Sequence, residues 1–143
     1  MFADTLLRAQ QEQLFRIVAW GVGSLVVGLA VLLATMRRRH STALLRSFCV
    51  QLAGWGAVEI GYAVWGYHTL RMLDFAGATH LERVVWLNLG LDAGAGAAGL
   101  ALIGYGWRRA ARREVLLGSG AGLLLQGAAL LVINVQLASA VVR

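Results

Sequence analysis

Two acidic residues, Glu59 and Asp92, each lie inside an apolar run that is long enough to cross a membrane. A carboxylate in hydrocarbon is costly, so an acid at such a place marks a functional site by default. Two neighbouring buried carboxylates cannot both be ionised cheaply, so we expect one to hold a proton unless Arg16 compensates the charge. This chemistry suits proton movement, ligand binding or docking of a partner. The alternative is that the acids only join helices through hydrogen bonds, as polar side chains do in small membrane bundles.

Polar residues of the other apolar runs fall at a similar depth. With a helical rise of about 1.5 Å per residue, Glu59 lies roughly 13 Å from the nearer end of its run, and Asp92 and Asn134 lie about 12 Å from the nearer ends of theirs. Asn88 precedes Asp92 by four residues and therefore shares its helix face. We expect one buried polar cluster, whose members are Glu59, Asp92, Asn88, Asn134, Gln136 and Arg16.

Four apolar runs separated by short polar links must position these residues. The chain has 143 residues, of which 59% are hydrophobic and 14% charged, whereas about a quarter of a soluble domain is charged. Each run has the ~20 residues that a membrane helix needs, and backbone groups in lipid must pair within their own segment. The expected spans are 14–36, 44–68, 84–107 and 115–142. The predicted fold is therefore all-α, a single domain of four transmembrane helices in an up-down bundle.

The segments outside these spans leave two questions open. The amphipathic segment 1–13 either extends the first helix or lies on the membrane surface. The link 69–83 either covers the bundle as a lid or lies against lipid. Residues 79–82 have the pattern of a capping box that opens the third helix, and Ser41 or Thr42 would cap the second.

The distribution of arginine predicts the orientation. The net charge is +6, every basic residue except the histidines is arginine, and the arginines concentrate in the first and third links. By the positive-inside rule these links face the cytoplasm, so both termini and the link 69–83 face outward. In this setting we expect anionic lipid headgroups as partners rather than nucleic acid. The residues expected at the headgroups are Arg37, Arg38, Arg39, Arg108, Arg109, Arg112 and Arg113.

Glycines supply candidate faces for close helix packing. The chain has 18 glycines and no proline. Gly118 and Gly122 form a GxxxG pair on the fourth helix, and Gly94 lies among alanines on the third. These three are predicted to pack helices together, either inside the bundle or at the seam of a homodimer.

The stretch 86–92 (WLNLGLD), with Gly99 and the earlier Gly54-Trp55 and Glu59-Ile60-Gly61, resembles a family of small uncharacterised bacterial four-span membrane proteins, known only as a domain of unknown function. The resemblance covers mainly the second and third helices. It implies a multi-pass protein of the bacterial inner membrane and brings no assigned activity.

The expected function is that of a non-enzymatic integral membrane protein, a structural, assembly or accessory subunit of a membrane complex or a homo-oligomer. No Ser-His-Asp arrangement at membrane depth, HExxH or CxxC is visible, so we expect no catalytic residues, no metal and no cofactor. One alternative is a proton-coupled small-molecule transporter or channel that uses Glu59 and Asp92. A second is a haem or quinone binder, for which His68 and His80, on the same side of the membrane, are the candidate ligands.

Overall fold

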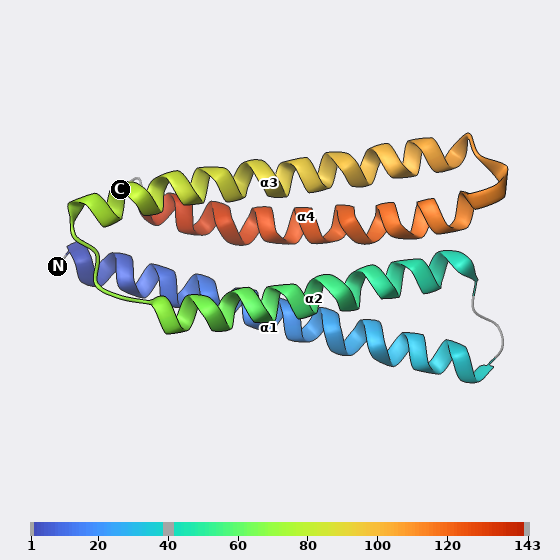
Figure 1. Ribbon diagram of the computed structural model, residues 1–143, viewed down its shortest axis with the longest axis horizontal. Helices are drawn as coiled ribbons and strands as arrows, with labels where there is room; N and C mark the ends of the chain where they lie inside the picture. Colours follow the sequence, from blue (N-terminus) through green and yellow to red (C-terminus); the bar gives the residue numbers. More distant parts are fainter. Residues whose placement is uncertain (1, 39–41, 142–143) are drawn as a thin grey trace.

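The computed structural model describes residues 2–38 and 42–141, and these residues form four long helices, as the apolar runs predict. A short 3-10 helix precedes the last of them (Figure 1). The elements are α1 (Phe2–Arg38), α2 (Ala43–Thr69), α3 (Phe75–Trp107), η1 (Ala110–Arg112) and α4 (Arg113–Val141).

The helices form two hairpins that pack through α4. α1 and α2 make one hairpin and α3 and α4 the other (Figure 1). α4 packs against α3, α2 and α1, whereas α3 packs extensively against α4 alone among the four long helices. The start of α1, the end of α4 and the connection 70–74 lie at one end, which we call the loop end (Figure 1). The opposite end carries η1 and the arginine-rich segments, and we call it the arginine end.

The amphipathic N-terminal segment extends the first helix, because α1 is continuous from Phe2. Residue 1 lies outside the described residues. Leu6 and Gln13 are both buried in this extension. The segment therefore packs into the bundle and does not lie apart from it.

The link between the second and third helices is shorter than expected, because α3 begins at Phe75. Asp74 is the N-cap, and its Oδ1 accepts a hydrogen bond of 2.8 Å from the backbone N–H of Gly77. The capping box expected at 79–82 is therefore wrong: Thr79 lies inside the helix and donates to the carbonyl of Phe75. The carboxylate of Asp74 accepts from a free backbone N–H group at the start of the helix, more than one turn before Thr79. No proline lies between these two residues to stop the helix.

The N-cap of α2 is Thr42, whose hydroxyl accepts from the backbone N–H of Leu45 at 3.3 Å. The other candidate, Ser41, lies outside the described residues. Glu114 of α4 adds a second acceptor at this helix start, because its carboxylate accepts from the backbone N–H of Ala43 at 3.0 Å.

Three helices in the described part of the chain are long and apolar enough to cross a membrane. They lie at Asp4–Met36, Phe75–Trp107 and Arg113–Val141. α2 has sufficient length, 27 residues, but it carries Arg46, Gln51 and Glu59 and is not among the three.

The surface also has the character of a membrane protein. Large apolar side chains such as Phe75, Trp86 and Leu91 are exposed, whereas several of the most buried side chains are polar. Because a soluble protein shows the opposite distribution, the exposed apolar surface supports contact with lipid.

Glycines bring the helix backbones into close contact, but not all at the positions that the sequence predicts. Gly118 and Gly122 face α2, the second against the side chain of Gln51. Gly94 does not pack helices together inside the bundle, because it is exposed and a side chain there would meet nothing within 4 Å. Its place at the seam of a homodimer stays a prediction. α3 instead meets α4 through Gly96 and Gly99, which lie on a different face of the helix from Gly94.

Candidate functional site

Glu59 on α2 and Asp92 on α3 line the same cavity, which has a volume of about 160 Å³. Both side chains are buried, with 4% and 8% of their surface exposed. Asn88 and Asn134 also line this central cavity, so the structure brings four of the six expected cluster residues together. The remaining lining residues are Ile17, Trp55, Val58, Tyr62 and Leu130.

Close glycine crossings place each acid beside the cavity. On the α1–α2 side, a methyl group on Gly21 would lie 2.9 Å from the carbonyl oxygen of Gly56 and 3.1 Å from Cβ of Glu59. On the α3–α4 side, a methyl group on Gly127 would lie 2.6 Å from the backbone nitrogen of Gly96 and 2.7 Å from the carbonyl oxygen of Asp92. Since real Cβ atoms do not approach so closely, only glycine permits these crossings, and they fix the backbone that carries each carboxylate.

Asp92 is held by a chain of buried hydrogen bonds across three helices. Asn134 Nδ2 donates to Asp92 Oδ2 at 2.6 Å, and Gln13 Nε2 donates in turn to Asn134 Oδ1. Gln13 and Asn134 are as deeply buried as the acid. Asp92 is therefore oriented by α1 and α4 together, and Asn134 uses both ends of its amide.

Glu59 is in the opposite situation, since no described residue donates a hydrogen bond to either of its buried carboxylate oxygens. A buried polar group without a partner loses its hydration and gains nothing in return. The amide nitrogen of Gln126 is also buried without an acceptor among the described residues, although its oxygen accepts from the indole N–H of Trp20.

Arg16 and Gln136 do not belong to this buried cluster, contrary to the expectation. Arg16 donates to Gln136 and forms an ion pair with Glu12 at 3.3 Å, one helical turn away. The side chains of Arg16 and Glu12 are 43% and 67% exposed. Asn134 and Gln136 are two residues apart, so they point to different sides of α4. Arg16 therefore does not compensate the charge of Glu59 or Asp92.

Two further cavities border the central cavity, one towards each end of the bundle. Towards the loop end it meets a cavity of about 590 Å³, the end cavity, with which it shares Tyr62. Towards the arginine end it borders a cavity of about 300 Å³, the deep cavity, with which it shares Trp55, Asn88, Asp92 and Leu130. We call the three cavities together the α2–α3 groove. It exists because α3 packs against α4 and leaves the side of α2 uncovered.

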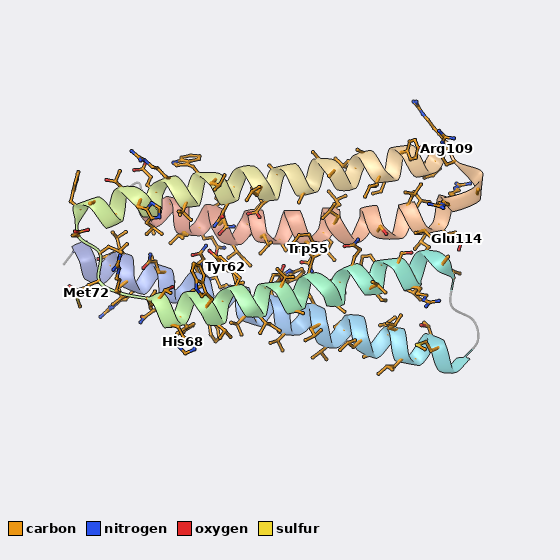
Figure 2. All side chains as sticks on the ribbon, in the orientation of Figure 1. Trp55, Tyr62, His68, Met72, Arg109 and Glu114 are labelled. Atoms are coloured by element: carbon orange, nitrogen blue, oxygen red, sulfur yellow. The ribbon has the colours of Figure 1, made fainter. Side chains whose placement is uncertain are left out.

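Two aromatic residues of α2 stand on either side of Glu59. Figure 2 shows Trp55 and Tyr62 projecting from α2 into the space beside α3 and α4. The indole N–H of Trp55 donates to Gln51 at 3.1 Å, which holds the ring in place. With 36% and 40% of their surface exposed, these rings form the lateral wall of the groove.

Sequence reasoning missed Gln13 and did not place Gln126 in the cluster. Gln13 belongs to a stretch rich in glutamine, glutamate and arginine, which has the composition of a wet surface segment. Its burial follows from the continuation of α1 alongside α4, which makes residue 13 a neighbour of residue 134. The available signal was the lack of any helix-breaking residue between 2 and 14.

The structure does not bring the histidines together as a pair of ligands. His80 lines the end cavity, whereas His68 points away from the groove (Figure 2). His40 lies outside the described residues. Among the residues described, no group of three or more His, Cys, Asp or Glu side chains is arranged to hold a metal ion.

The third link, between α3 and α4, is rich in arginine and forms a basic surface at the arginine end. Arg108, Arg109 and Arg112 line a cavity of about 620 Å³ beside η1. The guanidinium of Arg109 lies over the ring of Tyr105 at 5.1 Å, and that of Arg113 lies over Trp107 at 5.0 Å. α1 ends at Arg38, and Arg39 lies outside the described residues.

Comparison with known proteins gives one finding. Residues 16–135 match a family that is described as a family of unknown function (DUF6992). The expected resemblance to a domain of unknown function is thus confirmed, and the match includes all or most of each of the four long helices. No curated protein and no solved structure matches the chain.

Proposed function

Because the chain belongs to the family of unknown function DUF6992, which assigns it no activity, we propose a function from the geometry. The protein is a non-enzymatic integral membrane protein that exchanges a proton for a small-molecule ligand at Glu59. The second acid, Asp92, orients the site and adds negative charge to it.

One observation carries this proposal: Glu59 lines a cavity while both its oxygens are buried without a hydrogen-bond donor among the described residues. A carboxylate in this position is neutralised either by a proton or by an external positive group. The two solutions exclude each other, because both neutralise the same charge. A ligand that enters therefore displaces the proton, and this mutual exclusion is the physical basis of coupling.

The proposal places all four long helices in the bacterial inner membrane. α2 runs between the loop end and the arginine end as the other helices do (Figure 1), so a bilayer around its neighbours also encloses it. Its polar residue Glu59 faces the bundle, which is how membrane proteins accommodate an acid. The arginine end is cytoplasmic and contacts anionic lipid headgroups, so the loop end faces outward.

Infrared spectroscopy of the purified protein in lipid tests whether Glu59 holds a proton. We expect a protonated-carboxyl band at neutral pH that is lost in Glu59→Gln and retained in Glu82→Gln, a matched change at an exposed acid of α3. The band should shift when H₂O is replaced by D₂O, because the end cavity, which shares Tyr62 with the central cavity, gives water an approach from the loop end. A missing band, or a band that never exchanges, would overturn the proposal.

A second candidate function, an accessory subunit of a membrane complex, is supported by the outer face of α3. Trp86 and Leu87 are exposed there, and Gly90 and Gly94 have open space beside them. Such a face permits close approach of a further transmembrane helix. In native membranes, Gly90→Leu with Gly94→Leu should release the chain from a larger complex; a chain that is already monomeric before the change contradicts this candidate.

A further inference from the structure

We infer that the ligand of the α2–α3 groove is an amphiphilic organic cation, a molecule with one positively charged nitrogen or phosphorus centre on an aromatic or aliphatic body. This inference rests on the proposed function and names the ligand class of the same site. It is carried by the charge, the aromatic walls and the apolar floor of the groove.

The charge of the central cavity selects a cation. Glu59 and Asp92 face it, and none of its described lining residues is basic. The arginine of α1 at this level, Arg16, is paired with Glu12 outside the buried cluster. An anion would meet two acids, and a neutral molecule would leave Glu59 no better neutralised than before.

The aromatic residues beside Glu59 favour an organic cation over a hydrated inorganic one. Trp55 precedes Glu59 by four residues and Tyr62 follows it by three, so both rings border the cavity that the carboxylate lines. A cation near an indole or phenol face gains cation–π attraction, most strongly where water is excluded. A bound metal ion is usually held by several His, Cys, Asp or Glu side chains, and no group of three or more of these is found among the described residues.

The apolar residues that line the groove would contact the apolar body of the ligand. Ile17, Val58 and Leu130 line the central cavity, and Leu91, Ala95 and Leu123 line the deep cavity beyond it. The central cavity of about 160 Å³ holds the charged group, and the adjoining cavity of about 300 Å³ holds the body. A small number of charged groups in a mainly apolar pocket is the usual composition of a small-molecule site.

The proton and the organic cation reach Glu59 by different routes. The end cavity is lined by Arg71, whose positive charge disfavours entry of a cation from the loop end but does not stop water from delivering a proton. The exposed edges of Trp55 and Tyr62 border the groove on its lateral side, so the cation enters from the bilayer between α2 and α3. On binding, the proton of Glu59 leaves to water and the cation takes its place, so the net charge of the cavity is unchanged.

Isothermal titration of the full chain in an uncharged detergent tests the inference with two probes of the same shape and opposite charge. Tetraphenylphosphonium should bind at one site per chain, and tetraphenylborate should bind at least about tenfold more weakly, because the acids that attract the phosphonium repel the borate. Lowering the pH should weaken the binding of the cation, since protons compete for the same carboxylate. Equal binding of both probes overturns the inference.

Variants connect the binding to the groove. Glu59→Gln should weaken tetraphenylphosphonium binding at least about tenfold, and Trp55→Leu should weaken it severalfold, since an aromatic face is lost. Glu59→Asp should retain more affinity than Glu59→Gln, which separates the loss of charge from misfolding. Glu82→Gln should bind like the unchanged chain. Unchanged affinity in Glu59→Gln overturns the inference.

The same titration tests the cation site and the proton exchange separately. Repeated in buffers of different ionisation enthalpy, it counts the protons released per cation bound. Binding without proton release overturns the proposed exchange but leaves the cation site standing. Absence of cation binding in a protein that shows the exchangeable carboxyl band overturns the cation site and leaves the proton chemistry standing.

Discussion

Asn134 of α4 donates a 2.6 Å hydrogen bond to Asp92 of α3, so the third and fourth helices are joined by a polar contact in the interior of the bundle. Across the same cavity, Glu59 of α2 has no donor among the described residues. The two acids therefore differ in kind: one contributes to the fold, and the other is kept at a cost to it. Natural proteins retain such costs where function requires them.

Exchanging each acid for leucine should change stability in opposite directions. Glu59→Leu removes two unpartnered oxygens and should raise the free energy of unfolding by about 1–3 kcal/mol. Asp92→Leu leaves the amide of Asn134 without its acceptor and should lower the free energy of unfolding by a similar amount. Thermal unfolding in detergent, followed by circular dichroism, measures both. If the two variants shift in the same direction, the assignment of roles is wrong.

Asn134 should be more important than its neighbouring amide. Asn134→Leu breaks the bonds to both Asp92 and Gln13, and we expect a loss of about 2–4 kcal/mol in unfolding free energy. Gln136→Leu removes a contact to Arg16 at the surface and should change the free energy by less than about 0.5 kcal/mol. Comparable losses in a single set of melting curves would contradict the buried chain of hydrogen bonds.

Two glycines should respond very differently to alanine. Gly127→Ala places a methyl group against the backbone of α3 next to Asp92, and separating the helices should cost about 1–3 kcal/mol. Gly94→Ala puts the same methyl group into open space and should be neutral or slightly stabilising, since alanine favours a helix. The comparison of unfolding temperatures checks this, and a destabilised Gly94→Ala would indicate that this face is covered in the assembled protein.

The start of α3 can be located by removing its cap. Asp74→Ala deprives the N–H of Gly77 of its acceptor and should lower the unfolding free energy by about 0.5–2 kcal/mol. Thr79→Ala lies inside the helix, at the position that the sequence pattern marks as the cap, and should cost less than about 0.5 kcal/mol. A larger loss of unfolding free energy in Thr79→Ala than in Asp74→Ala would show that the helix begins near Thr79.

Labelling of single cysteines tests the proposed orientation and the fourth span. In a Cys49→Ala background, Arg71→Cys should react with a membrane-impermeant thiol reagent added to spheroplasts with an intact inner membrane. Thr42→Cys and Arg109→Cys should react only after that membrane is opened, because the arginine end is cytoplasmic. Labelling of residues 42 and 71 from the same side would show that α2 does not cross the membrane.

The local features of the helices could be predicted from the sequence with few errors. Apolar length and the absence of proline predict four long helices, and the structure contains them. The cap of α2 at Thr42 was one of two candidates. The pattern of four residues at 79–82 predicts a start of α3 that is too late, because the helix begins after the single acceptor Asp74. Competing caps differ by little free energy, so local sequence does not decide between them.

The membership of the polar cluster could be predicted only in part. Depth along a helix follows from residue number, and this brought Glu59, Asp92, Asn88 and Asn134 to one level. Depth does not give the direction in which a side chain points, so it also predicts Arg16 and Gln136 as members, although both lie at the surface. Gln13 was left out because its neighbours resemble a surface segment.

By itself the sequence determined that the chain forms long apolar helices, that two acids lie deep within them, and that arginine concentrates between particular helices. These properties depend on composition and on the fixed rise of a helix, which are local. Only the tertiary structure decided that α3 packs on α4 and leaves its side of α2 uncovered, that Asn134 satisfies Asp92, and that the buried Glu59 lines a cavity. These depend on which glycine faces meet, and several alternative faces of similar composition were available in one chain.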